Sequence, residues 1–135
     1  MIHLDSSFLI DLLRETSGGR PGPALDFIES LDASEVLGVS VHVACELRAG
    51  AELSRRTLQE HEGLDRLLSG LLVAYPDDRF PPAFGRLLAA TNRGGKPLAA
   101  MDLLIATAAL LDDAPIVTRN VKDFSRMPGL RVLRY

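Results

Sequence analysis

The 135-residue sequence contains one cysteine, no tryptophan and few aromatic residues. Its single cysteine, Cys45, excludes an internal disulfide bond and fits a reducing compartment. We expect Cys45 to pack as a small buried apolar side chain rather than to act as a nucleophile. Aromatic residues make up 5% of the chain, and they form no stripe on which nucleic-acid bases would stack.

The sequence also lacks an apolar run of the roughly 18 to 20 residues that cross a bilayer. Its N-terminal stretch, MIHLDSSFLIDLL, has an Asp inside the apolar part, no basic start and no small-residue cleavage site. We therefore expect no signal peptide and a cytoplasmic protein. The net charge of −3 argues against binding nucleic acid by bulk charge alone, although local basic patches remain compatible with it.

Hydrophobic residues, by contrast, are abundant, at 47% of the chain. This is ample material for a core, and the sequence has no repeat or low-complexity tract. A length of 135 residues is that of one ordinary domain. We expect residues 1–135 to form a single domain.

Short apolar runs alternate with helical patterns along the chain. Ser6 and Ser40 each precede such a pattern and are expected N-caps. The expected strands are 1–5, 36–40, 71–76, 114–118 and 130–135, and the expected helices are 7–15, 24–31, 41–50, 52–71, 81–95 and 100–113, with a turn and short helix within 119–129. This alternation favours a three-layer α/β/α domain with a central, mostly parallel sheet.

Four acidic residues fall where such a sheet would gather them. Ligands of open α/β sheets bind beyond the carboxyl ends of the strands. Asp5 ends the first expected strand, and Asp123 follows the strand 114–118. Glu46 lies in the helix after the second strand, and Asp102 opens the apolar stretch AMDLLIATAALL. Each has an ordinary alternative, as a helix cap, a solvated helix flank or a turn residue, but these do not explain the coincidence of all four.

Crowded carboxylates repel one another and resist ionisation unless a cation or proton intervenes. Carboxylate oxygens suit Mg²⁺ or Mn²⁺, whereas a zinc site needs clustered Cys and His. The three histidines are scattered, and we assign each to packing or to the surface: His3, His42 and His61. A site of this kind supports metal-assisted phosphodiester hydrolysis best. We expect Asp5 and Asp102 to hold the metal, with Glu46 and Asp123 as further candidates.

Four stretches occur in an order and spacing that cover nearly the whole chain: LDSSFLIDLL, SVHVACELRAG, GKPLAAMDLLIATAAL and IVTRNVKDFSRMPGLRV. Together they resemble PIN-domain proteins and, within that family, the VapC-type toxins of bacterial toxin–antitoxin pairs. The resemblance implies a PIN-like fold and a Mg²⁺-dependent endoribonuclease. It further implies a toxin that hydrolyses RNA, inhibits translation and is neutralised by a cognate VapB-type antitoxin.

Carried over residue by residue, the family's acidic set falls on the same four positions: Asp5, Glu46, Asp102 and Asp123. The fourth position stays open, because related chains carry the acidic residue either there or at Asn120. Thr118 and Ser6 would support the carboxylates by hydrogen bonds. Val43 departs from the family, since many relatives carry Thr or Ser there, and this leaves Glu46 with one fewer candidate partner.

Contact with RNA requires cations, and Arg119 and Lys122 lie beside the expected site. For the further basic residues a solvated charged face is the better explanation: Arg55, Arg56, Arg126, Arg131 and Arg134. The resemblance implies that the helices 24–31 and 52–71 form a groove for the antitoxin, although their apolar residues would equally complete the core. It also implies a homodimer or a toxin–antitoxin hetero-oligomer.

Two other functions are compatible with the same residues. One is a non-catalytic PIN-like binding module that keeps the acidic pocket for structure. The other is a metal-dependent nuclease acting on DNA, which the same chemistry permits. The absence of an added arch or DNA-binding domain argues against the second.

Overall fold

The computed structural model describes residues 1–135. A sheet of five short strands forms its centre: β1 (Ile2–Leu4), β2 (Leu37–Ser40), β3 (Leu72–Ala74), β4 (Ile116–Val117) and β5 (Val132–Leu133). The strand order is β3-β2-β1-β4-β5. Every neighbouring pair is parallel, so all carboxyl ends lie at one edge. The strands are shorter than the sequence indicated, but their order along the chain is as expected.

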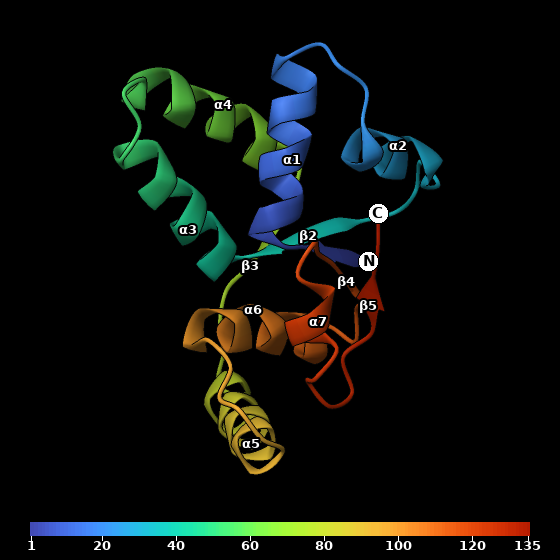
Figure 1. Ribbon diagram of the computed structural model, residues 1–135, viewed down its shortest axis with the longest axis vertical. Helices are drawn as coiled ribbons and strands as arrows, with labels where there is room; N and C mark the ends of the chain where they lie inside the picture. Colours follow the sequence, from blue (N-terminus) through green and yellow to red (C-terminus); the bar gives the residue numbers. More distant parts are fainter.

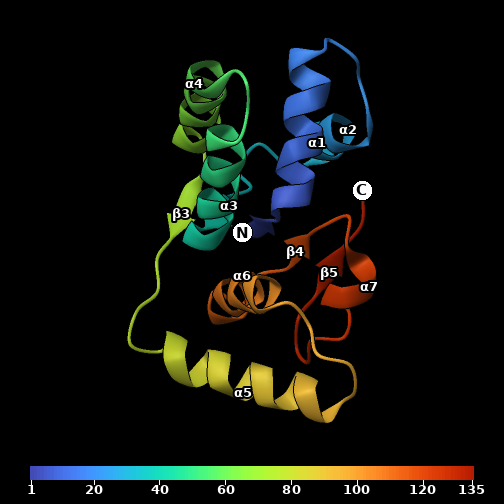
Figure 2. The same ribbon diagram turned by 60° about the vertical axis from the view of Figure 1, so that its left-hand side comes forward.

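Helices cover both faces of this sheet (Figure 1). They are α1 (Ser6–Ser17), α2 (Pro23–Ser30), α3 (Val41–Glu52), α4 (Thr57–Ser69), α5 (Phe80–Arg93), α6 (Ala100–Leu111) and α7 (Val121–Phe124). The helices α1 to α4 lie on one side, and α5 and α6 on the other, an arrangement that the turned view of Figure 2 also shows. The expected three-layer α/β/α fold is confirmed. None of the helices combines the length and the apolar character that a bilayer span requires.

The core lies against the central strand β1 and its neighbour β4, whose residues are all buried. Parallel strands covered on both faces need apolar side chains on both, which accounts for the continuous apolar runs in the sequence. From the first helical layer, Phe8 of α1 is fully buried and meets Phe27 of α2 edge-on, with ring centroids 5.5 Å apart. The apolar residues of α2 are therefore used against α1.

Helix α6 is the most deeply buried helix of the second layer. Six of its residues are buried, and Ala106 and Ala109 are completely inaccessible. Small side chains at these positions let the helix backbone approach its neighbours closely. This packing fixes the start of α6, where Asp102 lies in the first turn.

The expected helix 52–71 is wrong at its beginning. Helix α3 continues through Gly50 to Glu52, and α4 begins only at Thr57. A turn centred on Ser54 separates them, because its hydroxyl accepts the Arg56 N–H and its carbonyl accepts the Thr57 hydroxyl. Serine competes with the helix backbone in this way without any glycine or proline to signal it.

Two smaller expectations also fail. Ser6 is not the N-cap of α1: Asp5 occupies that position, and its side chain makes no capping hydrogen bond. Cys45 is exposed rather than buried, because the buried face of α3 is the one that carries Val43, Leu47 and Ala51. The second expected cap is confirmed, since the Ser40 hydroxyl accepts the His42 N–H.

Candidate active site

Asp5 lies at the carboxyl end of β1 and is 4% exposed. Its Oδ2 accepts hydrogen bonds from the Thr118 hydroxyl at 2.7 Å and from the Ser7 hydroxyl at 2.8 Å. Both hydrogen bonds fix the orientation of the carboxylate. The Asp5 side chain is thus held for interaction beyond the sheet rather than for capping α1.

The segment after β4 is tied to the same network. The Ser7 hydroxyl accepts the Arg119 N–H at 3.1 Å, and the Thr118 hydroxyl accepts the Asn120 N–H at 3.0 Å. The expected support by Thr118 therefore has a structural basis, whereas Ser7 was missed. The signal available for it was the pair of hydroxyl residues directly after Asp5, only one of which was considered.

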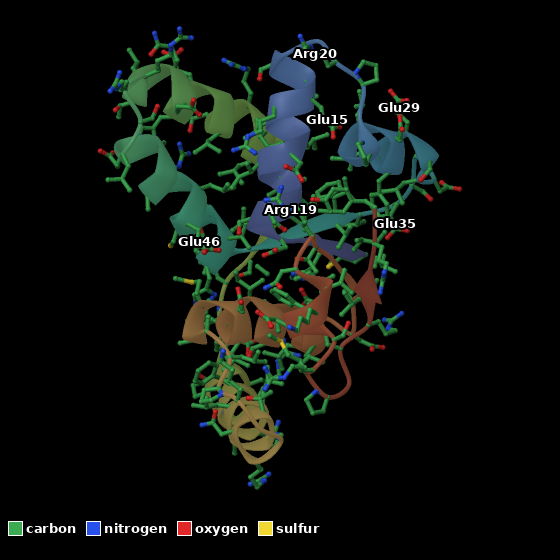
Figure 3. All side chains as sticks on the ribbon, in the orientation of Figure 1. Glu15, Arg20, Glu29, Glu35, Glu46 and Arg119 are labelled. Atoms are coloured by element: carbon green, nitrogen blue, oxygen red, sulfur yellow. The ribbon has the colours of Figure 1, made fainter.

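Glu46 lies in the second turn of α3, close to where this helix leaves the sheet (Figure 3). Its Oε1 accepts the Ser6 hydroxyl at 3.0 Å, so Ser6 supports Glu46 and not its own helix terminus. Burial raises the pKa of Glu46, the charge of Asp5 raises it further, and the Ser6 bond opposes the shift. Val43 is fully buried and packs in the core, and Ser6 supplies the hydroxyl partner of Glu46.

The pKa of Asp102 reflects the charges of the other three acidic residues. Burial, followed by the charges of Asp5, Glu46 and Asp123, raises the pKa of Asp102 from 3.8 to about 6. All three neighbouring charges act on it although they come from distant parts of the chain. The four acidic residues therefore share one electrostatic environment at the carboxyl edge of the sheet.

The fourth acidic position is occupied by a pair. The Asn120 amide donates to Oδ2 of Asp123 at 3.2 Å, across the first turn of α7. Asp123 contributes the charge that acts on Asp102, whereas Asn120 orients Asp123. Both candidates for this position therefore lie at the site: Asp123 as a charged group and Asn120 as its hydrogen-bond donor.

The two basic residues expected beside the site differ in their contacts. Arg119 lies near the sheet end of α1 (Figure 3) and forms an ion pair with Asp11, in which Nη1 is 2.9 Å from Oδ1. Lys122 is exposed and forms no ion pair in the structure. Asp11 was not among the residues singled out from the sequence.

The donor chemistry of the site fits a hard divalent cation, because its four acidic side chains offer only oxygen. The structure contains no group of three or more His, Cys, Asp or Glu side chains arranged to hold a metal ion. Burial and, after it, the charges of the other three carboxylates raise the pKa of Asp102, and a bound cation would relieve that repulsion. Zinc ligands are not gathered anywhere in the molecule.

A groove of about 500 Å³ begins at this site and runs between α1, α3 and α4. Ser6 and Glu46 line one part of it, and Ile10, Leu13 and Leu64 provide apolar walls. Helix α4 lines this groove, whereas α2 packs its apolar face against α1 and so completes the core. That the groove receives an antitoxin stays a prediction.

The fold and the site define an α/β protein with an acidic carboxyl edge. The model of the PIN domain family matches residues 2–130, and the chain belongs to this family. Among curated proteins, it is 31% identical over 103 residues to ribonuclease VapC2 of Rickettsia felis, covering 76% of this chain and 77% of that protein. It is 28% identical over 128 residues to ribonuclease VapC1 of Haemophilus influenzae, covering 95% and 92%.

Solved structures agree with the sequence relatives. The crystal structure of VapBC2 from Rickettsia felis bound to a DNA fragment from their promoter contains a chain with a TM-score of 0.89 and 26% identity, and the match covers 100% of this chain and 99% of that one. The structure of VapBC-1 from nontypeable Haemophilus influenzae gives a TM-score of 0.85 and 27% identity, covering 99% and 98%. The whole chain thus has the fold of these proteins.

Proposed function

We propose that this chain is an endoribonuclease toxin that hydrolyses RNA phosphodiester bonds, inhibits translation and is neutralised by a VapB-type antitoxin. The observation that carries the proposal is the acidic carboxyl edge of the sheet. Asp5 follows β1 and is tied to Thr118 after β4, Glu46 is held by Ser6, and Asp102 opens α6. The charges of Asp5, Glu46 and Asp123 act on Asp102 in addition to its burial. Similarity to ribonucleases named VapC over most of their length supports the same activity.

PIN-domain ribonucleases generally depend on divalent metal ions. For this chain we assign Mg²⁺, with Mn²⁺ as a substitute, held by Asp5 and Asp102 and completed by Glu46 and Asp123. When bound, such a cation stabilises the charge that develops on the phosphate and on the leaving oxygen.

The residues of the chain hold these carboxylates ready. Thr118 and Ser7 orient Asp5, and Ser6 orients Glu46. Asn120 orients Asp123. Asp102 stands in the first turn of the buried helix α6, which fixes its position. Its pKa, raised by burial and by the neighbouring carboxylates, would fall when a cation binds. Groups fixed before the ligand arrives lose little entropy on binding it.

The antitoxin is the partner that the groove between α1, α3 and α4 would receive. Its apolar walls suit the apolar face of a peptide helix or extended segment. Its two glutamates, Glu46 and Glu60, outnumber its one arginine, Arg14, and favour a basic side chain on that segment. A segment seated there would cover Glu46 and so block the site. The same partner makes the resting form a toxin–antitoxin hetero-oligomer, in which two copies of the toxin would pair.

A cleavage assay tests the proposal and separates it from its alternatives. Purified protein is incubated with labelled single-stranded RNA or DNA, in Mg²⁺ or in EDTA, beside the variant Asp102→Asn. We expect cleavage of RNA only, in Mg²⁺ only, and none by the variant. Cleavage of DNA alone would identify a DNA nuclease, and no cleavage of either by folded protein would favour a binding module.

A further inference from the structure

A second cavity, of about 370 Å³, opens beside the acidic site. Thr118 lines this cavity, and its hydroxyl donates a hydrogen bond to Asp5. The cavity and the acidic site therefore share Thr118. Two arginines, Arg119 and Arg134, also line this cavity. The proposed metal ligands are acidic, whereas the cavity next to them carries guanidinium groups.

Arg119 is oriented toward binding. Its backbone N–H is fixed by the Ser7 hydroxyl, and its Nη1 donates to both oxygens of Asp11, at 2.9 and 3.1 Å. The donors on Nε and Nη2 have no partner within the protein and remain available. The side chain is 58% exposed, so these donors are accessible to a ligand that approaches from solvent.

Asp11 is itself held from the other side. The Tyr135 hydroxyl donates to its Oδ2 at 2.6 Å, and the Tyr135 ring meets the buried Phe8 edge-on, with centroids 4.8 Å apart. Burial, together with the bond to Asp11, raises the pKa of Tyr135, which keeps its hydroxyl protonated. Asp11 and Tyr135 thus act as positioning residues for Arg119.

Charge decides which ligand fits. Arg134 is exposed and forms no ion pair, so the cavity carries two guanidinium groups against the one carboxylate of Asp11. It is a locally positive site in a chain with a net charge of −3. Guanidinium donors match phosphate oxygens in number and geometry.

We propose that this cavity binds the phosphate next to the one that is cleaved, through Arg119 and Arg134. The inference rests on the proposed ribonuclease function and adds a substrate-positioning site to it. The RNA strand then runs from the acidic edge to the cavity, with one phosphate at the edge and its neighbour in the cavity. Because the ligand is the backbone, the contact holds the strand without selecting its sequence.

Binding of RNA at several salt concentrations tests the proposal. A fluorescent single-stranded RNA is titrated with protein carrying Asp102→Asn, to prevent cleavage, at constant Mg²⁺. Arg119→Ala and Arg134→Ala are compared with Arg93→Ala, which removes an exposed arginine at the end of α5. We expect each cavity variant to weaken binding by about tenfold and to reduce the salt slope by about 0.7, with Arg93→Ala unchanged.

Further outcomes separate this inference from the function beneath it. If the parent protein binds no RNA, the proposed function itself fails. If RNA binds but the cavity variants behave like Arg93→Ala, only the phosphate site is wrong. The phosphate site is also wrong if the cavity variants bind RNA normally and lose only affinity for the antitoxin. Tyr135→Phe keeps the charge of Arg119 and loses its support, so it should weaken binding while leaving the salt slope unchanged. If Arg119→Ala does not fold, Arg134→Ala alone decides the test, because Arg134 is exposed and its removal leaves the packing unchanged.

Discussion

At the scale of single residues, Thr118 connects the two halves of the site. It is completely buried, donates to Asp5 and accepts the Asn120 N–H. Replacing it by Val keeps the shape, but it leaves the Asn120 N–H without its partner and removes one of the two hydroxyl donors to Asp5. We expect Thr118→Val to lower the free energy of unfolding by about 1 to 3 kcal/mol and to weaken Mg²⁺ binding, as measured by denaturant titration and calorimetry.

Thr107 provides the matched control for this change. It is also completely buried, but its hydroxyl donates to the Leu103 carbonyl within α6, which already has a backbone partner in the helix. Thr107→Val should therefore cost much less and leave Mg²⁺ binding unchanged. Equal effects of the two substitutions would show that the Thr118 hydroxyl has no special role.

A second prediction concerns the pH dependence that Asp102 imparts. Its pKa is 3.8 as a free side chain and about 6 in the folded protein. Between these values the folded protein keeps a proton that the unfolded chain has released, so the free energy of unfolding falls as pH rises and levels off above about 6. In EDTA, Asp102→Asn should therefore gain stability relative to the parent from pH 4 to pH 6. A difference that does not change with pH would contradict the shift.

At the scale of elements, the burial of α6 makes a testable demand on its small residues. Ala106 is completely inaccessible, so Ala106→Leu overpacks the core and should cost about 1 to 3 kcal/mol. Because the strain displaces the start of the helix, we also expect weaker Mg²⁺ binding at Asp102. Thermal melts and Mg²⁺ titrations measure both effects.

The control places the same substitution on an exposed surface. Ala49 lies on α3 and is exposed, so Ala49→Leu should change the stability by no more than about 0.5 kcal/mol. If Ala106→Leu melts and binds metal like this control, α6 is not the rigid support described above.

The elements also show what the sequence could predict. Apolar periodicity located α6 and β1, and the parallel sheet followed from the alternation of strands and helices. The turn at Ser54 was missed because it depends on hydroxyl hydrogen bonds in a stretch without glycine or proline. Ser7 and Asp11 were missed for a related reason: their partners, Thr118 and Tyr135, lie more than a hundred residues away, and no local pattern records such contacts.

At the scale of the whole molecule, toxicity is the property that the proposed function predicts. Expression of this chain alone in a bacterium should arrest growth, and co-expression of its cognate VapB-type antitoxin should restore growth. Growth curves and rates of protein synthesis measure the effect, because the reaction proposed here inhibits translation. Asp102→Asn, expressed at the same level, is the control and should have no effect. Normal growth with abundant soluble parent protein would contradict the toxin function.

The pairing of β1 with β4 also determines when the site can form during synthesis of the chain. Asp5 emerges early from the ribosome, whereas its hydroxyl partner Thr118 follows 113 residues later. At about 5 to 20 residues per second, this delay lasts roughly 6 to 23 seconds. During synthesis the nascent chain therefore holds only part of its acidic edge until β4 has emerged and paired with β1.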